Sequence, residues 1–570
     1  MKYIKNILLL TSTLLFVACD ESSFLEEINP NATTSAIFWE TENQFNSGLT
    51  TVYGALQFQN VSGSGLQYEM VRADLGGTES WYAPNTFRNL TYTDGTFYVT
   101  DKWNELYVGI FRANQVIENI NTVDPTVFTE NSKNEIEAQA RFLRAYFYFE
   151  LVNTYGGAVM QTKIAETTED LKQPFSSIEE VNNAIIIPDL DFAKENLPLE
   201  WTSSDDLGRV TQGSAKSLLG KVYLYDKKWS EAADLFKEVI DSNVYTLVPD
   251  ILDNFTDQNE FNSESIFEVN FSSTIAAGVN GNIVDNSTTE TGAEASALAR
   301  PLAQLNFGGY NTVLPSYYLH ELFVYDEVDS TNPVNNGNTQ SKRMGASIVP
   351  KNGDGEYYNL PIGQKAGWAY GQSSYVKKHT NWYNQESEDV NSRSGINYRA
   401  IRLADVYLMY AEAVLMDTGD FNTAITYIDK VRTRAGVKTL QEYMNENVGQ
   451  FPQLHISKQV HTVQPLVNPS IETVLTHIQR VERPLELCFE GQRWKDLVRW
   501  GIVEQVFTEL RADEVWRQNN LDVTGEGEAP IYINERIRPD FIIASSVYNS
   551  AQHDYFPVPT LEVQANNNLN

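Results

Sequence analysis

The sequence predicts a mainly α-helical protein that folds as one compact domain with long loops and a few short strands. Apolar residues recur at helical spacing over much of the 570-residue chain. Strand-like runs are short and scattered. The length alone would suggest several domains, but no Pro-rich or Gly/Ser-rich linker separates one part from another. We therefore expect one compact body with long surface loops.

The helical pattern begins near residue 41 and is carried first by three segments. Thr41 and Gln44 can form a capping box at the start of the first helix. The same apolar period runs over 103–120. The segment 135–155 carries apolar or aromatic residues on nearly every side, which predicts a helix buried on more than one face and placed centrally.

Two later segments resemble tetratricopeptide helix pairs, in which small residues let antiparallel helices cross closely. In the segment 214–240 the small residue is Gly220, and in 402–436 it is Ala411 with Ala424. A weaker third unit would pair 103–120 with 135–155. Ordinary helix packing without repeat ancestry is the alternative. The pattern predicts a scaffold of paired helices.

Strands and loops fill the remaining chain. The predicted strands are short and apolar, and they fall at 266–271, 373–378 and 555–558. The predicted loops are rich in Asn, Ser, Gly and charge, and they fall at 272–299, 329–356 and 384–397. The first of these, 272–299, is expected to be an exposed excursion from the one domain.

Cys19 closes a segment typical of a secretory signal. A basic start with Lys2 and Lys5 precedes an apolar run and the small residue Ala18. The run is shorter than the roughly 20 apolar residues that a spanning helix needs. LLFVAC resembles a bacterial lipobox, so we expect residues 1–18 to be removed and Cys19 to be acylated. Several acyl chains hold a protein stably at a membrane. A plain signal peptide with an incidental cysteine is the alternative.

Charge and cysteine content exclude several function classes. The net charge of −33 argues against nucleic-acid binding, which relies on cationic contacts to phosphate. It also disfavours polyanionic ligands, although solubility alone can explain an acidic surface. Cys488 is the only other cysteine and lies in an apolar stretch, which predicts a buried, inert thiol. Six histidines show no zinc-like spacing.

No motif of a known catalytic site is present, so no catalytic residue is predicted. The chain lacks a Gly-x-Ser-x-Gly elbow, a phosphate loop and a His-Glu-x-x-His segment. Among 75 acidic residues a glycosidase carboxylate pair stays open as an alternative. NGDGE at 352–356 lacks the ligand spacing of a calcium loop and is interpreted as a turn. We predict no cofactor, with a structural calcium ion left open.

The segment 72–89 has the side-chain chemistry that recognises sugars. Sugars present flat C–H faces that lie on aromatic rings, and their hydroxyl groups need carboxylate, amide or guanidinium partners. Glycines and a proline in the segment indicate a loop. Trp81 could instead be a core residue that anchors this loop, and the same alternative holds for Tyr310 in a later loop. The candidate contacts are Asp74, Trp81, Tyr82, Asn85 and Arg88.

Five segments together resemble the SusD/RagB lipoproteins of Bacteroidota over nearly the whole chain after the signal. The most specific is ERPLELCFEGQRWKDLVRWG. Its residues are interpreted as structural, with ion pairs Glu490–Arg493 and Asp496–Arg499 on one helix and a buried stripe that includes Trp494. The segments are 19–41, 139–157, 419–436, 482–501 and 555–563.

The resemblance implies a SusD-like fold divided into a signal and three regions. It also implies a non-catalytic, lipid-anchored glycan-binding protein on the outside of the outer membrane, which delivers oligosaccharides to a SusC-like TonB-dependent transporter. The ligand would be a neutral glycan. A RagB-like peptide-import lipoprotein is the first alternative, and a lipid-anchored glycoside hydrolase is the second. The regions are 1–18 (signal), 19–225 (N-terminal), 226–300 (helix and variable loop) and 301–570 (C-terminal).

The resemblance also implies a second aromatic loop beside 72–89. That loop corresponds to FGGYNTVLPSYY at 307–318, with Tyr310 and Asn311 as the expected contacts. Three further aromatic residues flank polar loops and are weaker candidates for the glycan site: Trp368, Tyr370 and Trp382.

Overall fold

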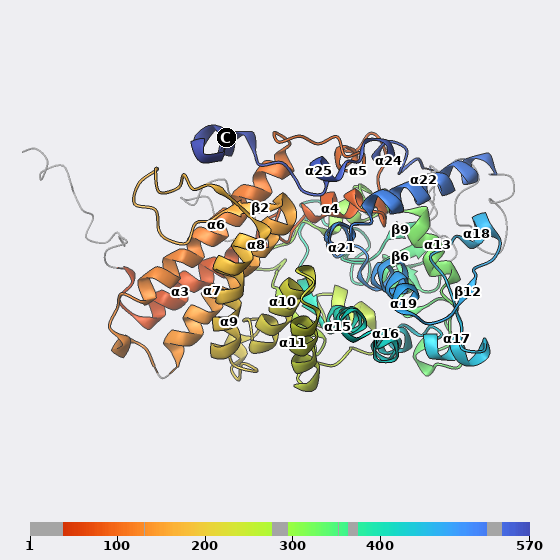
Figure 1. The fold of residues 1–570 in the computed structure, drawn as a ribbon, viewed down its shortest axis with the longest axis horizontal. Helices are drawn as coiled ribbons and strands as arrows, with labels where there is room; N and C mark the ends of the chain where they lie inside the picture. Colours follow the sequence, from red (N-terminus) through yellow and green to blue (C-terminus); the bar gives the residue numbers. More distant parts are fainter. Residues whose placement is uncertain are drawn as a thin grey trace, which may run out of the picture.

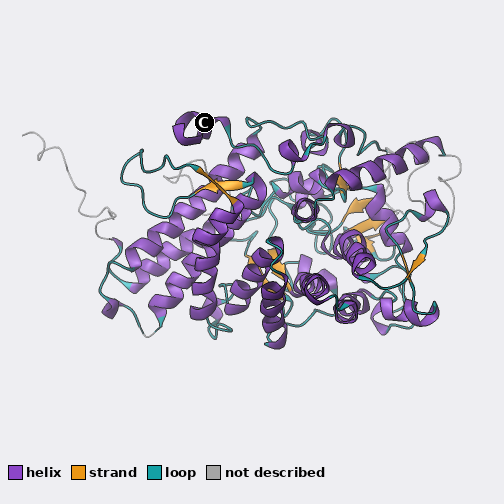
Figure 2. Ribbon diagram, viewed as in Figure 1, coloured by secondary structure: helices purple, strands orange, loops and turns teal. Residues whose placement is uncertain are grey.

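The computed structural model describes residues 38–129, 131–275, 294–350, 353–362, 374–520 and 538–569. These residues are mostly helical, with short strands in pairs, as the sequence predicts (Figures 1 and 2). None of their helices is both long and apolar enough to cross a membrane. Cys19, Trp368 and Tyr370 lie outside the described residues, so these predictions stay as they are.

A continuous array of helices forms one side of the molecule, and each helix packs against the next. In Figure 1 the array runs from the left edge to the lower centre. The two predicted helix pairs are α10 with α11 and α15 with α16, and α11 packs on α15. This arrangement is consistent with a tetratricopeptide-like scaffold. The array consists of α3 (Glu42–Gly54), α6 (Phe97–Ile120), α7 (Ser132–Tyr155), α9 (Ile187–Asn196), α10 (Gln212–Tyr225), α11 (Trp229–Asp241), α15 (Leu403–Thr418) and α16 (Phe421–Ala435).

Glycines allow close contact between neighbouring helices of the array. A Cβ atom at Gly220 of α10 would lie 2.7 Å from the ring of Phe236 in α11. A Cβ atom at Gly109 of α6 would lie 2.6 Å from Phe147 in α7. Because real Cβ atoms do not approach so closely, a larger residue at either position would push the helices apart. Thr41 caps α3 through the predicted capping box with Gln44.

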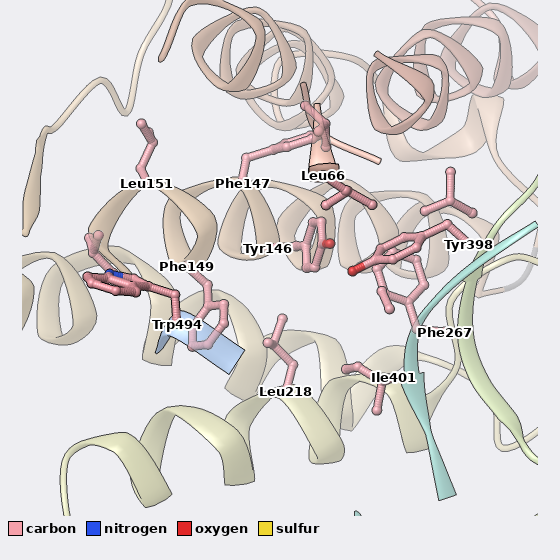
Figure 3. Close-up of a cluster of buried hydrophobic side chains, with 14 of the residues drawn as sticks. Leu66, Tyr146, Phe147, Phe149, Leu151, Leu218, Phe267, Tyr398, Ile401 and Trp494 are labelled. Carbon is pink, nitrogen blue, oxygen red and sulfur yellow. The ribbon is translucent and has the colours of Figure 1, made fainter. Parts of the chain in front are cut away.

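The helix α7 lies at the centre of the hydrophobic core, as its all-round apolarity predicts. Tyr146, Phe147 and Phe149 point from it toward side chains of other elements, among them Leu218 and Trp494 (Figure 3). The ring centroids of Tyr146 and Phe267 are 5.2 Å apart in an edge-to-face contact. Core contacts therefore tie the helical array to the C-terminal half of the chain.

The other helices are shorter on average and connect or cover the array. Two π-helical turns also occur, at Asn182–Ile186 and at Ile478–Glu482. The remaining α-helices are α4 (Leu66–Arg72), α5 (Asn85–Arg88), α8 (Ile178–Val181), α12 (Ala299–Leu302), α13 (Tyr317–Tyr325), α14 (Lys342–Ser347), α17 (Leu440–Glu446), α18 (Lys458–His461), α19 (Ile471–His477), α20 (Arg483–Leu487), α21 (Arg493–Trp500), α22 (Val503–Asn519), α24 (Ala544–Val547), α25 (Ser550–His553) and α26 (Thr560–Ala565).

The strands form antiparallel ladders of two, and two of these ladders join segments more than a hundred positions apart in sequence. The predicted strands at 266–271 and 373–378 are present as β4 and β9. The ladders are β1 (Gly76–Gly77) with β5 (Leu314–Pro315), β2 (Gly157–Val159) with β3 (Phe175–Ser177), β4 (Ser265–Val269) with β10 (Tyr398–Arg402), β6 (Ile348–Pro350) with β9 (Ser374–Val376), β7 (Glu356–Tyr357) with β8 (Leu360–Pro361), and β11 (Phe451–Pro452) with β12 (Leu466–Val467).

Two predictions of local structure are wrong. The segment 555–558 is not a strand, because Pro557 has no N–H to offer a ladder. The Phe556 N–H instead donates to the Thr154 carbonyl oxygen near the end of α7 at 2.7 Å. The expected loop at 329–356 contains α14 and β6, because Ser341 caps a helix by accepting from the Met344 N–H. The segment 384–397 is a loop, as predicted.

Ion pairs are buried inside the C-terminal half. The guanidinium groups of Arg343 and Arg432 both contact the carboxylates of Asp326 and Glu482, and all four side chains are fully buried. The Arg343–Asp326 pair measures 2.6 Å and the Arg432–Asp326 pair 2.9 Å. These contacts join α14, α16 and the π-helical turn Ile478–Glu482 through charge-assisted hydrogen bonds.

One predicted ion pair is present in 482–501 and the other is wrong. Asp496 and Arg499 pair at 2.9 Å along α21. Glu490 does not pair with Arg493, because it precedes α21 and lies against Arg402 and Lys378 instead. Trp494 is buried in the core, as expected. Cys488 is buried and unpaired.

Candidate functional site

The two candidate loops are brought together by the ladder of β1 and β5. Gly76 pairs with Pro315 and Gly77 pairs with Leu314. The Ser316 N–H extends this contact by donating to the Leu75 carbonyl oxygen at 2.9 Å. Residues more than 220 positions apart in sequence therefore lie side by side at the base of the site.

Glycine is required in β1 because other segments pack tightly against it. A Cβ atom at Gly76 would lie 2.4 Å from the Met70 carbonyl oxygen. At Gly77 it would lie 2.3 Å from a carboxylate oxygen of Asp540. The pair of glycines that indicated a loop in the sequence thus has a packing function as well.

The chain segments that lead to Trp81 and to Tyr310 leave this ladder at the same end. Each residue lies four residues beyond the Gly77–Leu314 pair, and antiparallel strands send these two continuations in the same direction. Four residues span at most about 14 Å, which bounds the distance of each residue from the ladder end. The side chain of Trp81 is 61% exposed and that of Tyr310 is 43% exposed. Two large aromatic rings are therefore available to a ligand beside one ladder.

Neighbouring side chains hold the two rings in place. The ring centroids of Trp81 and Tyr82 are 5.9 Å apart, and Tyr82 and Asn85 are partly exposed at the same loop. The guanidinium carbon of Arg300 lies 4.4 Å from the Tyr310 ring centroid. Arg300 is itself fixed by a hydrogen bond from its Nε to the Gly308 carbonyl oxygen at 2.9 Å. Such cation–π contacts orient a ring without removing it from solvent.

Asp74 and Arg88 were predicted as glycan contacts, and the structure places both in the interior. The Asp74 carboxylate is fully buried and accepts from Arg493 Nε at 2.7 Å and Nη2 at 2.8 Å. Arg88 is 1% exposed and donates to the carbonyl oxygens of Ala73 and Gly76. Both side chains shape the loop from beneath, so neither is available to a ligand at the surface.

Asn311 and Trp382, the other two described candidates near the second loop, are less exposed than Tyr310. Asn311 is buried and has a positive φ of 57°, and its N–H donates to the Ala303 carbonyl oxygen at 2.9 Å. Trp382 is half-buried, with the Lys377 ammonium 3.7 Å from its ring centroid. Burial lowers the pKa of Lys377 to about 8. Trp382 packs on a small cluster that includes Phe307, which comes from the same loop as Tyr310.

Sequence reasoning missed Arg300. It lies in α12, ten positions before the tyrosine that it supports, and the preceding polar stretch gave no pattern that linked the two. An arginine shortly before an aromatic loop would have been the only available signal, and it is a weak one.

The arrangement is suited to binding. Its exposed groups are aromatic rings and partly exposed polar side chains, which match the flat face and the hydroxyl groups of a sugar. Asp74 is the one carboxylate in the predicted set, and its ion pair with Arg493 occupies it. The predicted set therefore provides no pair of carboxylates for glycosidic acid/base chemistry.

Known proteins match the chain over both halves. The model of the SusD family matches residues 263–570, and a model described as "Starch-binding associating with outer membrane" matches residues 23–224. SusD-like protein P25 of Formosa agariphila is 24% identical over 93% of this chain and 96% of its own length. A SusD-like protein of Bacteroides ovatus is 24% identical over 87% of this chain and 82% of its own.

Solved structures show the same fold. A SusD superfamily protein of Bacteroides vulgatus aligns with a TM-score of 0.71 and 24% identity over 94% of this chain and 99% of that one. A laminarin-binding SusD-like protein aligns with a TM-score of 0.65 and 24% identity over 92% and 98%. Surface glycan-binding protein A of Bacteroides uniformis aligns with a TM-score of 0.64 and 20% identity over 93% and 99%. The resemblance seen in the sequence is confirmed: the chain belongs to the SusD family.

Proposed function

We propose that this protein captures neutral oligosaccharides at the surface of the outer membrane and delivers them to a SusC-like TonB-dependent transporter. A lipid on Cys19 would hold it there. The observation that carries the proposal is the pair of exposed rings, Trp81 and Tyr310, on segments that leave the β1–β5 ladder at the same end. We call these residues, with Tyr82 and Asn85, the aromatic surface.

The similar proteins support this choice of ligand. One solved structure of the same fold is named as laminarin-binding and another as a surface glycan-binding protein. The net charge of −33 disfavours polyanionic glycans by repulsion. Aromatic rings bind the apolar face of a sugar without regard to charge, so a neutral glycan satisfies both observations.

A binding screen with the mature wild-type protein tests the proposal. Native affinity electrophoresis against neutral polysaccharides should reveal at least one that retards the protein, whereas peptide pools should have no effect. Release of reducing sugar from the retarding polysaccharide should stay at the background level. Retardation by peptides alone would favour the peptide-import alternative, and steady release of sugar would favour a hydrolase.

A further inference from the structure

The aromatic surface has no charged side chain of its own. Its polar groups are the Asn85 amide, the indole N–H of Trp81 and the two tyrosine hydroxyls. Sugar hydroxyl groups form their strongest hydrogen bonds with carboxylate and guanidinium groups. The two such groups that the sequence assigned to the site, Asp74 and Arg88, are buried beneath the loop. Any charged contact at this site therefore comes from another segment.

The segment 387–393 lies against the loop that carries Tyr310. The Glu388 N–H donates to the Phe307 carbonyl oxygen at 2.8 Å. A Cβ atom at Gly308, which has a positive φ of 78°, would lie only 3.1 Å from the Glu388 carbonyl oxygen. These contacts involve the residues two and three positions before Tyr310. The segment 387–393 is therefore a direct neighbour of the aromatic surface in the fold, although it is distant in the sequence.

Arg300 joins this segment to the Tyr310 ring. Its Nη1 donates to the Val390 carbonyl oxygen and, at 3.4 Å, to the Ser392 hydroxyl oxygen. Its Nε donates to the Gly308 carbonyl oxygen at 2.9 Å, and its guanidinium carbon lies 4.4 Å from the Tyr310 ring centroid. Because only one hydrogen bond separates Arg300 from Val390, the Val390 carbonyl oxygen lies within roughly 9 Å of that centroid. The Val390 side chain is 77% exposed, so this segment reaches the surface beside the ring.

The same segment carries a partly exposed ion pair of Asp389 and Arg393. Arg393 donates to Asp389 Oδ2 from Nη2 at 2.7 Å and from Nε at 3.1 Å. The other carboxylate oxygen, Oδ1, accepts from the Asn391 N–H at 2.6 Å. The Arg393 side chain is 30% exposed and the Asp389 side chain 23% exposed. A carboxylate and a guanidinium are thus held in place beside the aromatic surface and are accessible to solvent.

The Asp389–Arg393 pair retains hydrogen-bonding capacity for a ligand. A guanidinium group has five N–H donors, and within the described residues Arg393 donates from two of its nitrogen atoms, both to Asp389. Burial opposes the charge on Asp389, but hydrogen bonds from Arg393 and from the Asn391 N–H hold the pKa of Asp389 below its usual range. The carboxylate therefore stays ionised at neutral pH and can accept from a hydroxyl group. The pair has no net charge, which suits a neutral ligand.

We propose that the Asp389–Arg393 pair is part of the glycan site and binds hydroxyl groups of the same glycan chain that lies on Tyr310. Arg393 donates from its remaining N–H groups to oxygen atoms of the glycan, and Asp389 accepts from a glycan hydroxyl group. This inference rests on the proposed function. It assigns to the pair the charged contacts that the sequence assigned to Asp74 and Arg88, and it extends the site to a third segment of the chain.

Calorimetry with the mature full-length chain tests this assignment. Laminarin and soluble starch are the first probes, and the other neutral polysaccharides of the electrophoretic screen follow. Arg393→Ala and Asp389→Asn should each weaken the affinity about tenfold to hundredfold, the range for a hydrogen bond to a charged group. Asp206→Ala is the matched control, because its pair with Arg209 is exposed to a similar extent but lies between α9 and α10. This variant should bind with the affinity of the wild type.

The urea midpoint of each variant adds a second readout. Partly exposed ion pairs contribute little to stability, so all three variants should unfold close to the wild-type midpoint. Wild-type affinity in Arg393→Ala and Asp389→Asn, with weakened binding by Tyr310→Ala, would overturn this inference and leave the proposed function intact. An affinity loss that occurs only with a clear fall in the midpoint would show a structural function of the pair and would also overturn it. If the wild-type protein binds no neutral polysaccharide, the inference and the proposed function both fail.

Discussion

Residues of one loop, 72–89, differ in function: one is exposed to solvent and others support the loop from the interior. Trp81 is 61% exposed, whereas Asp74 and Arg88 in the same loop are buried and hold the backbone from beneath. Composition identified all of them as sugar-binding side chains, because a buried arginine and an exposed one look alike in a sequence. The difference is set by Arg493, which lies 419 positions from Asp74 and occupies its carboxylate.

The buried pair of Asp74 and Arg493 makes a prediction about stability. Asp74→Ala leaves an uncompensated guanidinium in the interior, which should lower the free energy of unfolding by about 3–5 kcal/mol. Urea denaturation measures this loss. Asp389→Ala is the matched control, because its pair with Arg393 is partly exposed and such pairs contribute at most about 1 kcal/mol. Equal effects of the two variants would contradict the structural assignment of Asp74.

Cys19 makes a prediction about location. Because acylation is the attachment that the sequence predicts, Cys19→Ala should move the protein from the outer-membrane fraction to the soluble fraction or leave its signal uncleaved. Fractionation of cells labelled with palmitate measures both. If the variant stays membrane-bound to the same extent as the wild type, the prediction of a lipid anchor at Cys19 is wrong.

Helix contacts in the array depend on two glycines. Gly109→Ala places a methyl group 2.6 Å from Phe147 and should lower the free energy of unfolding by about 1–3 kcal/mol through overpacking. Gly345→Ala in α14 is the control, because among the described residues no atom outside its own helical turn lies within 4 Å of the place that its Cβ would take. This variant should be neutral or stabilising by up to about 1 kcal/mol. Thermal denaturation of both variants compares them. A neutral Gly109→Ala would show that α6 and α7 pack less closely.

Helices with strong apolar periodicity could be predicted from the sequence, and contacts distant in sequence could not. The pattern at 135–155 corresponds closely to α7, whereas α6 begins at Phe97, six residues before the predicted start. The loop 72–89 and Tyr310 were found as candidates. Their pairing through β1 and β5 depends on two-residue strands that leave no periodic signal. Glu490 was assigned to the wrong partner because sequence spacing implied a helix that begins only at Arg493.

At the scale of the whole molecule, many ion pairs are buried in the interior, although the overall composition is strongly acidic. Neighbouring guanidinium groups hold the pKa of Glu482 well below its usual range, and Arg402 with Lys378 lowers the pKa of Glu490 to about 2 against the opposing effect of burial. Lys495 with Lys102 likewise lowers the pKa of Glu150 to about 2. These carboxylates connect distant helices, so their protonation affects the whole fold.

Acid should therefore destabilise the protein in a defined window. A carboxylate whose folded pKa lies below its unfolded value of 4.5 contributes stability above pH 4.5 and loses it as the pH falls toward the folded pKa. We expect the urea midpoint to fall steadily between pH 4.5 and pH 2.5. The buried His320, whose pKa burial lowers to about 4, should add a decline between about pH 6.5 and 4 because it protonates only on unfolding. A midpoint that is constant below pH 4.5 would contradict the buried ion pairs.

The proposed partner gives another prediction for the whole molecule. If the protein delivers glycans to a transporter, mild-detergent pull-down from native membranes should recover a TonB-dependent outer-membrane protein with it. The transporter should be recovered only while the complex stays assembled, so its recovery should disappear in strong detergent. Isolation of this protein alone at every detergent strength would contradict delivery to a transporter.

The central claim is that the aromatic surface binds glycan, and calorimetry of variants tests it most directly. The ligand is the neutral glycan that binds the wild-type protein in the electrophoretic screen. Trp81→Ala and Tyr310→Ala should each weaken binding by about 1–3 kcal/mol, the cost of losing an aromatic anchor, with little change in melting temperature. Phe111→Ala, which removes a ring of 41% exposure from α6, should leave the affinity unchanged. Wild-type affinity in both Trp81→Ala and Tyr310→Ala would contradict the account.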